Sequence, residues 1–300
     1  MIERTVATDG PLDLGLVLGP LRFGGSRDPC LRIDRTGVWR ASTTAAGPAT
    51  VRLRQVGPDQ VKATAWGSGA EAALDAVPDL IGAADDQPPL ARAHPLVREL
   101  ERRFAGLRLG RSNAVLEALV PTVLAQKVIG LEARAAFVAL VRAAGRRAPG
   151  PTALLLPPEP RWLASLPSWA FHRWGVEHRR AATIKIAAAH AGRVEECTRL
   201  SPAEARRRLG ALPGVGVWTI NEVCHAALGD PDAVSVGDYW LKHVVSYALT
   251  GEPRGTDQRM LELLEPWRGQ RGRVCRLLML GAPRPPRYGP RLSLQGIAAY

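Results

Sequence analysis

The feature that most restricts the fold of this chain is a tight, glycine-rich turn between two segments with helical periodicity. The segments span residues 202–209 and 217–228, and the turn between them contains Leu212, Pro213, Gly214, Val215 and Gly216. The proline fixes one backbone torsion angle, and the glycines allow positive φ angles and the close approach of another backbone. The sequence therefore predicts two helices joined by a compact hairpin.

The predicted hairpin has a second property, because its backbone amides lie beside the N-terminus of the second helix. Such amides, together with the helix dipole, form a good seat for a phosphate group of DNA. A contact of this kind positions a duplex without reading its base sequence. The alternative is a plain connection between two helices, because glycine and proline are common in turns.

Alternation of apolar and polar residues marks the first part of the chain as a sheet. Three runs show this pattern, at residues 30–43, 49–56 and 60–66, and a short helical segment follows at 69–77. We therefore expect a small α+β domain with an antiparallel sheet over residues 1–82. Paired prolines and acidic residues then predict a linker over residues 83–93.

From residue 94 onward the helical period dominates. Residues 94–282 are predicted to form an all-α domain of many short helices, two of which are expected at 114–129 and 239–249. Residues 283–300 are rich in proline and arginine and predict an irregular tail. The expected fold class is therefore α+β, with a sheet domain followed by a helical domain.

The net charge favours a polyanionic partner. The chain has 40 Lys and Arg against 28 Asp and Glu, a net charge of +12, and nucleic acid is the simplest partner for such a chain. It has no run of roughly 18 apolar residues, and its first residues do not resemble a secretion signal. We therefore expect a cytoplasmic protein without a membrane span.

The four cysteines are too far apart in the sequence to predict a zinc site or an iron–sulfur cluster. They are Cys30, Cys197, Cys224 and Cys275. Small apolar residues in a reducing compartment are the preferred interpretation.

The hairpin and several further segments resemble one protein family. These segments are VSVGDYWLKHVVSYAL, which contains Asp238, together with VPTVLAQKVIGLEARA, WGVEHRRAATIKIAAA and EPWRGQRGRVCRLLML. They are similar to the helix-hairpin-helix superfamily of base-excision DNA glycosylases, and most similar to its 3-methyladenine DNA glycosylase II branch. The resemblance covers most of residues 94–280. It implies a nucleoid-associated monomer that binds double-stranded DNA and removes damaged, alkylated purines.

Asp238 is the residue at which the resemblance places the catalytic carboxylate. When the C1′–N bond of a nucleotide breaks, the sugar becomes an oxocarbenium-like cation. A carboxylate near the sugar stabilises this charge and orients or deprotonates the attacking water, with no need for a metal or another cofactor. The alternative role is helix capping, because Asp is favoured where a helix begins, and the two roles are compatible.

The resemblance also places a base pocket. Trp218 stands where bifunctional relatives have a Schiff-base lysine, so we expect a monofunctional enzyme that leaves an abasic site. Trp218, Tyr239 and Trp267 match aromatic pocket positions, and core packing is the alternative for each. Glu222, one helical turn after Trp218, replaces an aromatic residue of the family. Its carboxylate pairs either with a cationic base or with a nearby arginine.

The expected DNA contacts come from two places in the sequence. One is the hairpin together with Thr219, and the other is the segment with Gln126 and Lys127. Relatives have Leu or Gln after this glutamine and commonly Ser two residues later, whereas this chain has Lys127 and Ile129. Lys127 either fills the gap left by an everted base while reaching a phosphate, or is a solvated lysine at a helix end.

A different class of function has to be weighed against the enzyme. Helix-hairpin-helix modules also occur in proteins that bind DNA or recognise damage without catalysis. Such a module needs neither Asp238 nor an aromatic wall, which favours the enzyme. The departures at Glu222, Lys127 and Ile129 keep the non-catalytic alternative open.

Overall fold

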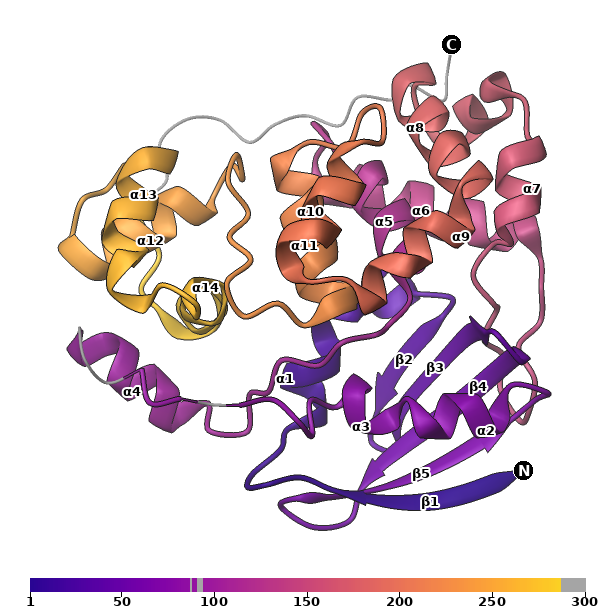
Figure 1. Ribbon diagram of the computed structural model, residues 1–300, viewed down its shortest axis with the longest axis horizontal. Helices are drawn as coiled ribbons and strands as arrows, with labels where there is room; N and C mark the ends of the chain where they lie inside the picture. Colours follow the sequence, from indigo (N-terminus) through magenta and orange to yellow (C-terminus); the bar gives the residue numbers. More distant parts are fainter. Residues whose placement is uncertain (87, 91–93, 287–300) are drawn as a thin grey trace.

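The computed structural model describes residues 1–86, 88–90 and 94–286, and Figure 1 shows how its elements are arranged. Part of the expected linker and most of the expected tail, residues 287–300, lie outside the described residues. In the part of the chain that is described, no helix is both long and apolar enough to cross a lipid bilayer.

The N-terminal region forms a five-stranded antiparallel sheet with the order β1-β5-β4-β3-β2. The alternating runs form four of these strands, as predicted. The strand β1 was not predicted, because it is an edge strand with mostly exposed side chains and lacks a clear apolar face. The strands are β1 (Ile2–Ala7), β2 (Leu31–Asp34), β3 (Gly37–Thr44), β4 (Gly47–Gln55) and β5 (Gln60–Trp66).

Each face of the sheet is covered by a different part of the chain. Apolar residues of α1 (Leu14–Leu18), α2 (Ala70–Asp75) and α3 (Val77–Leu80) pack on one face. On the other face Trp39 and Trp66 stack, with 5.5 Å between their ring centroids, and a segment of the helical region packs around them. The sheet is therefore covered on one face by three short helices and on the other by the segment of residues 145–159.

The helical region contains two separate apolar cores, where the sequence predicts one all-α domain. Buried side chains of α5–α11 form the larger core, and α4 packs with α12–α14 around the smaller one, to the left in Figure 1. The helices are α4 (Pro95–Arg103), α5 (Val115–Leu124), α6 (Gly130–Ala144), α7 (Pro160–Ser165), α8 (His178–Ala189), α9 (Ala191–Glu195), α10 (Pro202–Gly210), α11 (Val217–Leu228), α12 (Leu241–Thr250), α13 (Asp257–Leu264) and α14 (Arg271–Gly281).

A buried ion pair ties the expected linker to the helical region. Asp85, within the predicted linker, forms an ion pair with Arg273 of α14 and accepts a hydrogen bond from the amide of Leu109. Both charged side chains are less than 10% exposed. The described part of this segment is therefore anchored to the helical region, which its polar composition did not indicate.

The cysteines are all free and buried. Burial raises the pKa of the Cys224 and Cys275 thiols to about 12, so both are protonated and unreactive near neutral pH. This agrees with their interpretation as small apolar core residues.

Arg108 offers a test of how the first residues are held to the rest of the chain. Its buried guanidinium donates hydrogen bonds to the carbonyls of Asp9, Pro11 and Gly82. Arg108→Ala removes the donors of three carbonyls, and we expect it to lower the free energy of unfolding by about 3 kcal/mol. Arg54→Ala, at an exposed position of β4, should change it by less than about 0.5 kcal/mol. Urea unfolding measures both, and equal effects would contradict this role for Arg108.

Candidate active site

The predicted hairpin is present between α10 and α11. The helix α10 begins with a capping box between Ser201 and Glu204, and the amide of Val215 then closes the turn on the carbonyl of Leu212, at 3.1 Å. Gly214 has a φ of +84°, and a Cβ atom there would lie 2.0 Å from Oγ1 of Thr183 on α8. Glycine is thus required at this position both by the backbone conformation and by the neighbouring helix.

The N-terminus of α11 is open to an anion. No side chain caps this helix, which begins at Val217, and Gly214, Gly216 and Val217 are exposed. The first amides of a helix have no partner within the helix. An exposed, uncapped N-terminus of this kind attracts phosphate through its amides and its dipole.

Gln126 and Thr219, both expected to contact DNA, brace the hairpin from inside. The side-chain amide of Gln126 donates to the carbonyl of Gly214, at 3.0 Å, and to Oγ1 of Thr219, at 2.8 Å. Thr219 is only 2% exposed. These contacts favour a structural role for the two side chains, which hold the hairpin against the end of α5.

Lys127 is exposed and lies in a turn rather than in the helix predicted for residues 114–129. The helix α5 ends at Leu124, whose carbonyl accepts a hydrogen bond of 2.7 Å from the buried guanidinium of Arg180. Lys127 then adopts a φ of +56°, which is incompatible with a continuing right-handed helix. Because Arg180 comes from a different part of the chain, the local pattern did not reveal this end.

Asp238 lies in the turn that connects α11 to α12, and so between the two helical cores. Its Oδ1 accepts hydrogen bonds from the amides of Trp240 and Leu241, both at 2.8 Å, and its Oδ2 lies 3.4 Å from the indole nitrogen of Trp218. Asp238 is not the N-cap residue, because α12 begins at Leu241, not at residue 239, with Trp240 as its N-cap, but the Asp238 side chain accepts hydrogen bonds from the amides of both residues. The carboxylate is partly buried and held at both oxygens.

Glu222 reaches the same turn from the next turn of α11. Its carboxyl group accepts a hydrogen bond from the hydroxyl of Ser235, whose carbonyl accepts from the amide of Asp238. Burial raises the pKa of Glu222, and the negative charge of Asp238 raises it further. Ser235 and the positive charge of Arg276 on α14 oppose this shift.

The aromatic residues expected to form the pocket lie in different environments. Trp218 is partly buried beside Asp238, and Tyr239 is 65% exposed. Trp267 is 6% exposed within the core around α14, where its indole nitrogen donates to a main-chain carbonyl at 3.0 Å, which favours the packing alternative. Trp240, which the sequence analysis did not single out, is 43% exposed and makes an edge-to-face contact with Tyr239.

Ser235 and Arg276 were also not identified from the sequence. Ser235 is three residues before Asp238, so its place in the same turn was a usable signal. Arg276 is far away in the sequence and reaches Glu222 only through the packing of α14. Within the described ranges, no group of His, Cys, Asp and Glu side chains is arranged to hold a metal ion.

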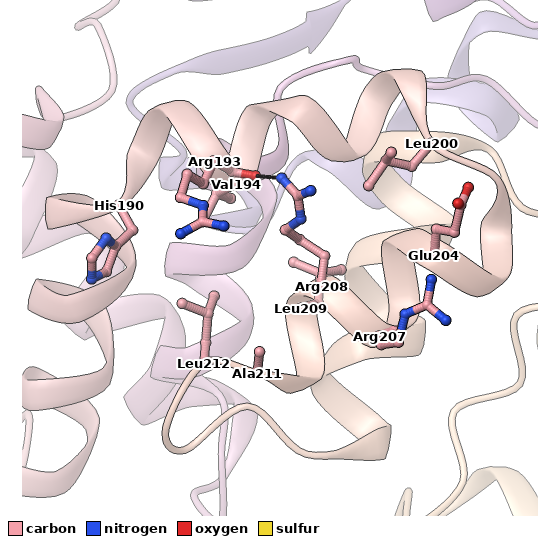
Figure 2. A pocket seen from close by; sticks show the side chains of 10 residues that line it. All are labelled: His190, Arg193, Val194, Leu200, Glu204, Arg207, Arg208, Leu209, Ala211 and Leu212. Carbon is pink, nitrogen blue, oxygen red and sulfur yellow. Dashed lines mark hydrogen bonds between the residues drawn. The ribbon is translucent and has the colours of Figure 1, made fainter.

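A groove of about 440 Å³ lies beside the hairpin, between α9 and α10 (Figure 2). Its arginines are partly engaged within the protein, because Arg208 pairs with Glu196 and donates to the carbonyl of Arg193. The groove is lined by His190, Arg193, Val194, Leu200, Glu204, Arg207, Arg208, Leu209, Ala211 and Leu212. Asp238 and the side chains around it do not line this groove, so it is distinct from the candidate active site.

The two hairpin glycines provide a matched pair of substitutions. Gly214→Ala places a Cβ atom against Thr183 and forces alanine into a left-handed conformation, so we expect the free energy of unfolding to fall by about 2 kcal/mol or more. Gly216 has an extended backbone and open space around its Cβ position. Gly216→Ala should therefore change the stability by less than about 0.5 kcal/mol. Denaturant unfolding compares them, and a Gly214→Ala protein as stable as Gly216→Ala would refute the close packing on α8.

The chain matches no protein-family model and no curated protein, but solved structures share its fold. The 3-methyladenine DNA glycosylase from Archaeoglobus fulgidus matches with a TM-score of 0.75 at 16% identity, over 92% of this chain and 97% of that chain. The 8-oxoguanine glycosylase/lyase of Clostridium acetobutylicum in its apo form matches with a TM-score of 0.72 at 14% identity, over 93% and 96%. The same enzyme in complex with double-stranded DNA gives a TM-score of 0.66 at 14% identity, over 92% and 96%. The fold expected from the sequence resemblance is confirmed, and the chain has the fold of these DNA glycosylases.

Proposed function

We propose that this protein is a monofunctional DNA glycosylase that hydrolyses the N-glycosidic bond of damaged, alkylated purines and leaves an abasic site. The observation that carries this proposal is the position of Asp238. Its carboxylate is fixed by two backbone amides and an indole, in the turn that follows a helix with an open phosphate seat. The two backbone amides bind only Oδ1, and Oδ2, whose partner is the Trp218 indole at 3.4 Å, has a second lone pair for the reaction.

In this proposal the hairpin binds the DNA backbone. The exposed amides at the start of α11 bind one phosphate of the damaged strand, and the net charge of +12 attracts the duplex as a whole. Phosphate contacts carry no sequence information, which suits an enzyme that must act at a lesion in any sequence. The protein acts as a nucleoid-associated monomer on double-stranded DNA.

The chemistry then takes place beside α11. The everted nucleotide places its deoxyribose near Asp238, whose charge stabilises the oxocarbenium-like sugar as the bond to the base lengthens. The same carboxylate orients a water molecule and accepts its proton as the water oxygen bonds to C1′. Because the carboxylate is already oriented by Trp240 and Leu241, little reorganisation is needed during the reaction.

The aromatic side chains around Asp238 support an alkylated substrate. Such purines carry positive charge, and the electron-rich faces of aromatic rings attract cations. Trp218 contacts the carboxylate directly, and the exposed rings of Tyr239 and Trp240 lie immediately after it in the chain. An everted base beside Asp238 is therefore within reach of aromatic surfaces.

Substitution of Asp238 tests the enzymatic role. Asp238→Asn keeps an oxygen that caps the helix but removes the charge, so we expect folding and DNA binding to persist while base release falls by about 100-fold or more. The assay is chromatography of bases released from methylated DNA. Asp13→Asn, at the N-cap of α1, makes the same change at another capping position and should leave base release intact. If the wild-type protein releases no damaged base, the non-catalytic alternative replaces this proposal.

The monofunctional mechanism has its own test. Trp218 cannot form a Schiff base with the sugar, and Lys242 at the start of α12 is paired with Asp257. We therefore expect no covalent complex with damaged DNA after treatment with borohydride, and intact strands until the abasic site is cleaved by alkali. A trapped complex would show lyase activity and would refute the monofunctional assignment.

A further inference from the structure

We propose that Glu222 is the acid that protonates the departing base, and that the site therefore excises neutral damaged purines as well as cationic ones. This inference rests on the proposed function and assigns a second catalytic residue to the same site. It concerns a carboxyl group of α11 that is hydrogen-bonded to Ser235, three residues before Asp238.

The geometry brings Glu222, on α11, to the segment that carries Asp238. Trp218 and Glu222 lie one helical turn apart on α11 and therefore on the same face. The indole nitrogen of Trp218 donates to Oδ2 of Asp238, and the carboxyl group of Glu222 accepts a hydrogen bond from the hydroxyl of Ser235. The main-chain carbonyl of Ser235 also accepts a hydrogen bond of 3.1 Å from the backbone amide of Asp238. Ser235 therefore contacts both acidic residues.

The surroundings of Glu222 favour its protonated form. Burial and the charge of Asp238 raise its pKa, while Ser235 and Arg276 oppose the rise. Arg276 is partly committed elsewhere, because it donates to the carbonyl of Leu16. His225, on the next turn of α11, adds no positive charge near neutral pH, because burial and then Arg276 lower its pKa to about 4. Burial and the neighbouring charge of Asp238 thus favour a proton on Glu222.

Two carboxyl groups in different environments can act as the general acid and the general base of a hydrolysis. As the C1′–N9 bond breaks, its electron pair moves onto the purine, and Glu222 gives its proton to a ring nitrogen of the leaving base. Asp238 takes a proton from water as the water oxygen bonds to C1′. The base leaves neutral, Asp238 releases its extra proton to solvent and Glu222 regains one, so both groups are restored and no oxidant, reductant or further reactant is required.

This role defines the substrate class more closely. An alkylated purine such as 7-methylguanine is already cationic and leaves without a proton. A neutral purine such as hypoxanthine is a poor leaving group unless it is protonated. An acid is therefore useful only for neutral bases, and its presence predicts that they belong to the substrate range.

The test compares single-turnover excision of hypoxanthine and 7-methylguanine from otherwise identical duplexes. Wild-type protein should release both, and the hypoxanthine rate alone should fall as the pH rises and Glu222 ionises. Glu222→Gln should lower the hypoxanthine rate by about 100-fold more than the 7-methylguanine rate, and should remove this alkaline fall. Equal losses for both bases, or a wild-type protein that releases 7-methylguanine but not hypoxanthine, would overturn the role of Glu222 and leave the proposed function standing.

Ser235→Ala distinguishes an acid from a residue that only shapes the pocket. The hydroxyl of Ser235 stabilises ionised Glu222, so its removal should shift the alkaline fall of the hypoxanthine rate to higher pH. A shift to lower pH, or none, would contradict proton donation by Glu222. The matched control is Glu117→Gln, because Glu117 is another carboxyl group whose pKa is raised by burial, but it faces Arg40 and the sheet. Glu117→Gln should preserve the ratio of the two rates and both pH profiles.

Discussion

The candidate site depends on two contacts between α11 and the turn that follows it. The indole of Trp218 donates a hydrogen bond to the carboxylate of Asp238, and the hydroxyl of Ser235 donates one to Glu222. This turn carries the chain from the larger helical core to the smaller one, so both cores fix the position of the carboxylate. A group held between two packed units is preoriented, which is what electrostatic stabilisation of a transition state requires.

The same helix begins at the hairpin, so the proposed phosphate site and the proposed catalytic carboxylate are held at a fixed separation. The hairpin is held from behind by Thr183, which leaves room only for glycine at position 214, and by the side chain of Gln126. The amides at the start of α11 remain uncapped because the neighbouring polar groups bond to one another. A strand bound at these amides is consequently positioned relative to Asp238 by a rigid helix.

The carboxyl groups of Asp238 and Glu222 have different environments, which suits them to the different roles proposed for them. Asp238 receives hydrogen bonds from two backbone amides, which fix the orientation of its carboxylate. Glu222 is desolvated next to that charge, which favours its neutral form. The sequence analysis left the partner of Glu222 open between a cationic base and an arginine. The structure adds Ser235 as its hydrogen-bond partner and Arg276 as the nearby charge.

The sequence alone determined the features that depend on local pattern: the antiparallel sheet without its edge strand β1, the hairpin with its required Gly214, and an aspartate just before the following helix. These are encoded within a few residues, because periodicity, turn chemistry and capping act over short distances. Only the tertiary structure decided the division of the helices into two cores, the end of α5 beneath Arg180, the inward role of Gln126 and the burial of Trp267. Each of these depends on side chains that are far apart in the sequence, and packing overrides local preference when a buried polar group must find its partner.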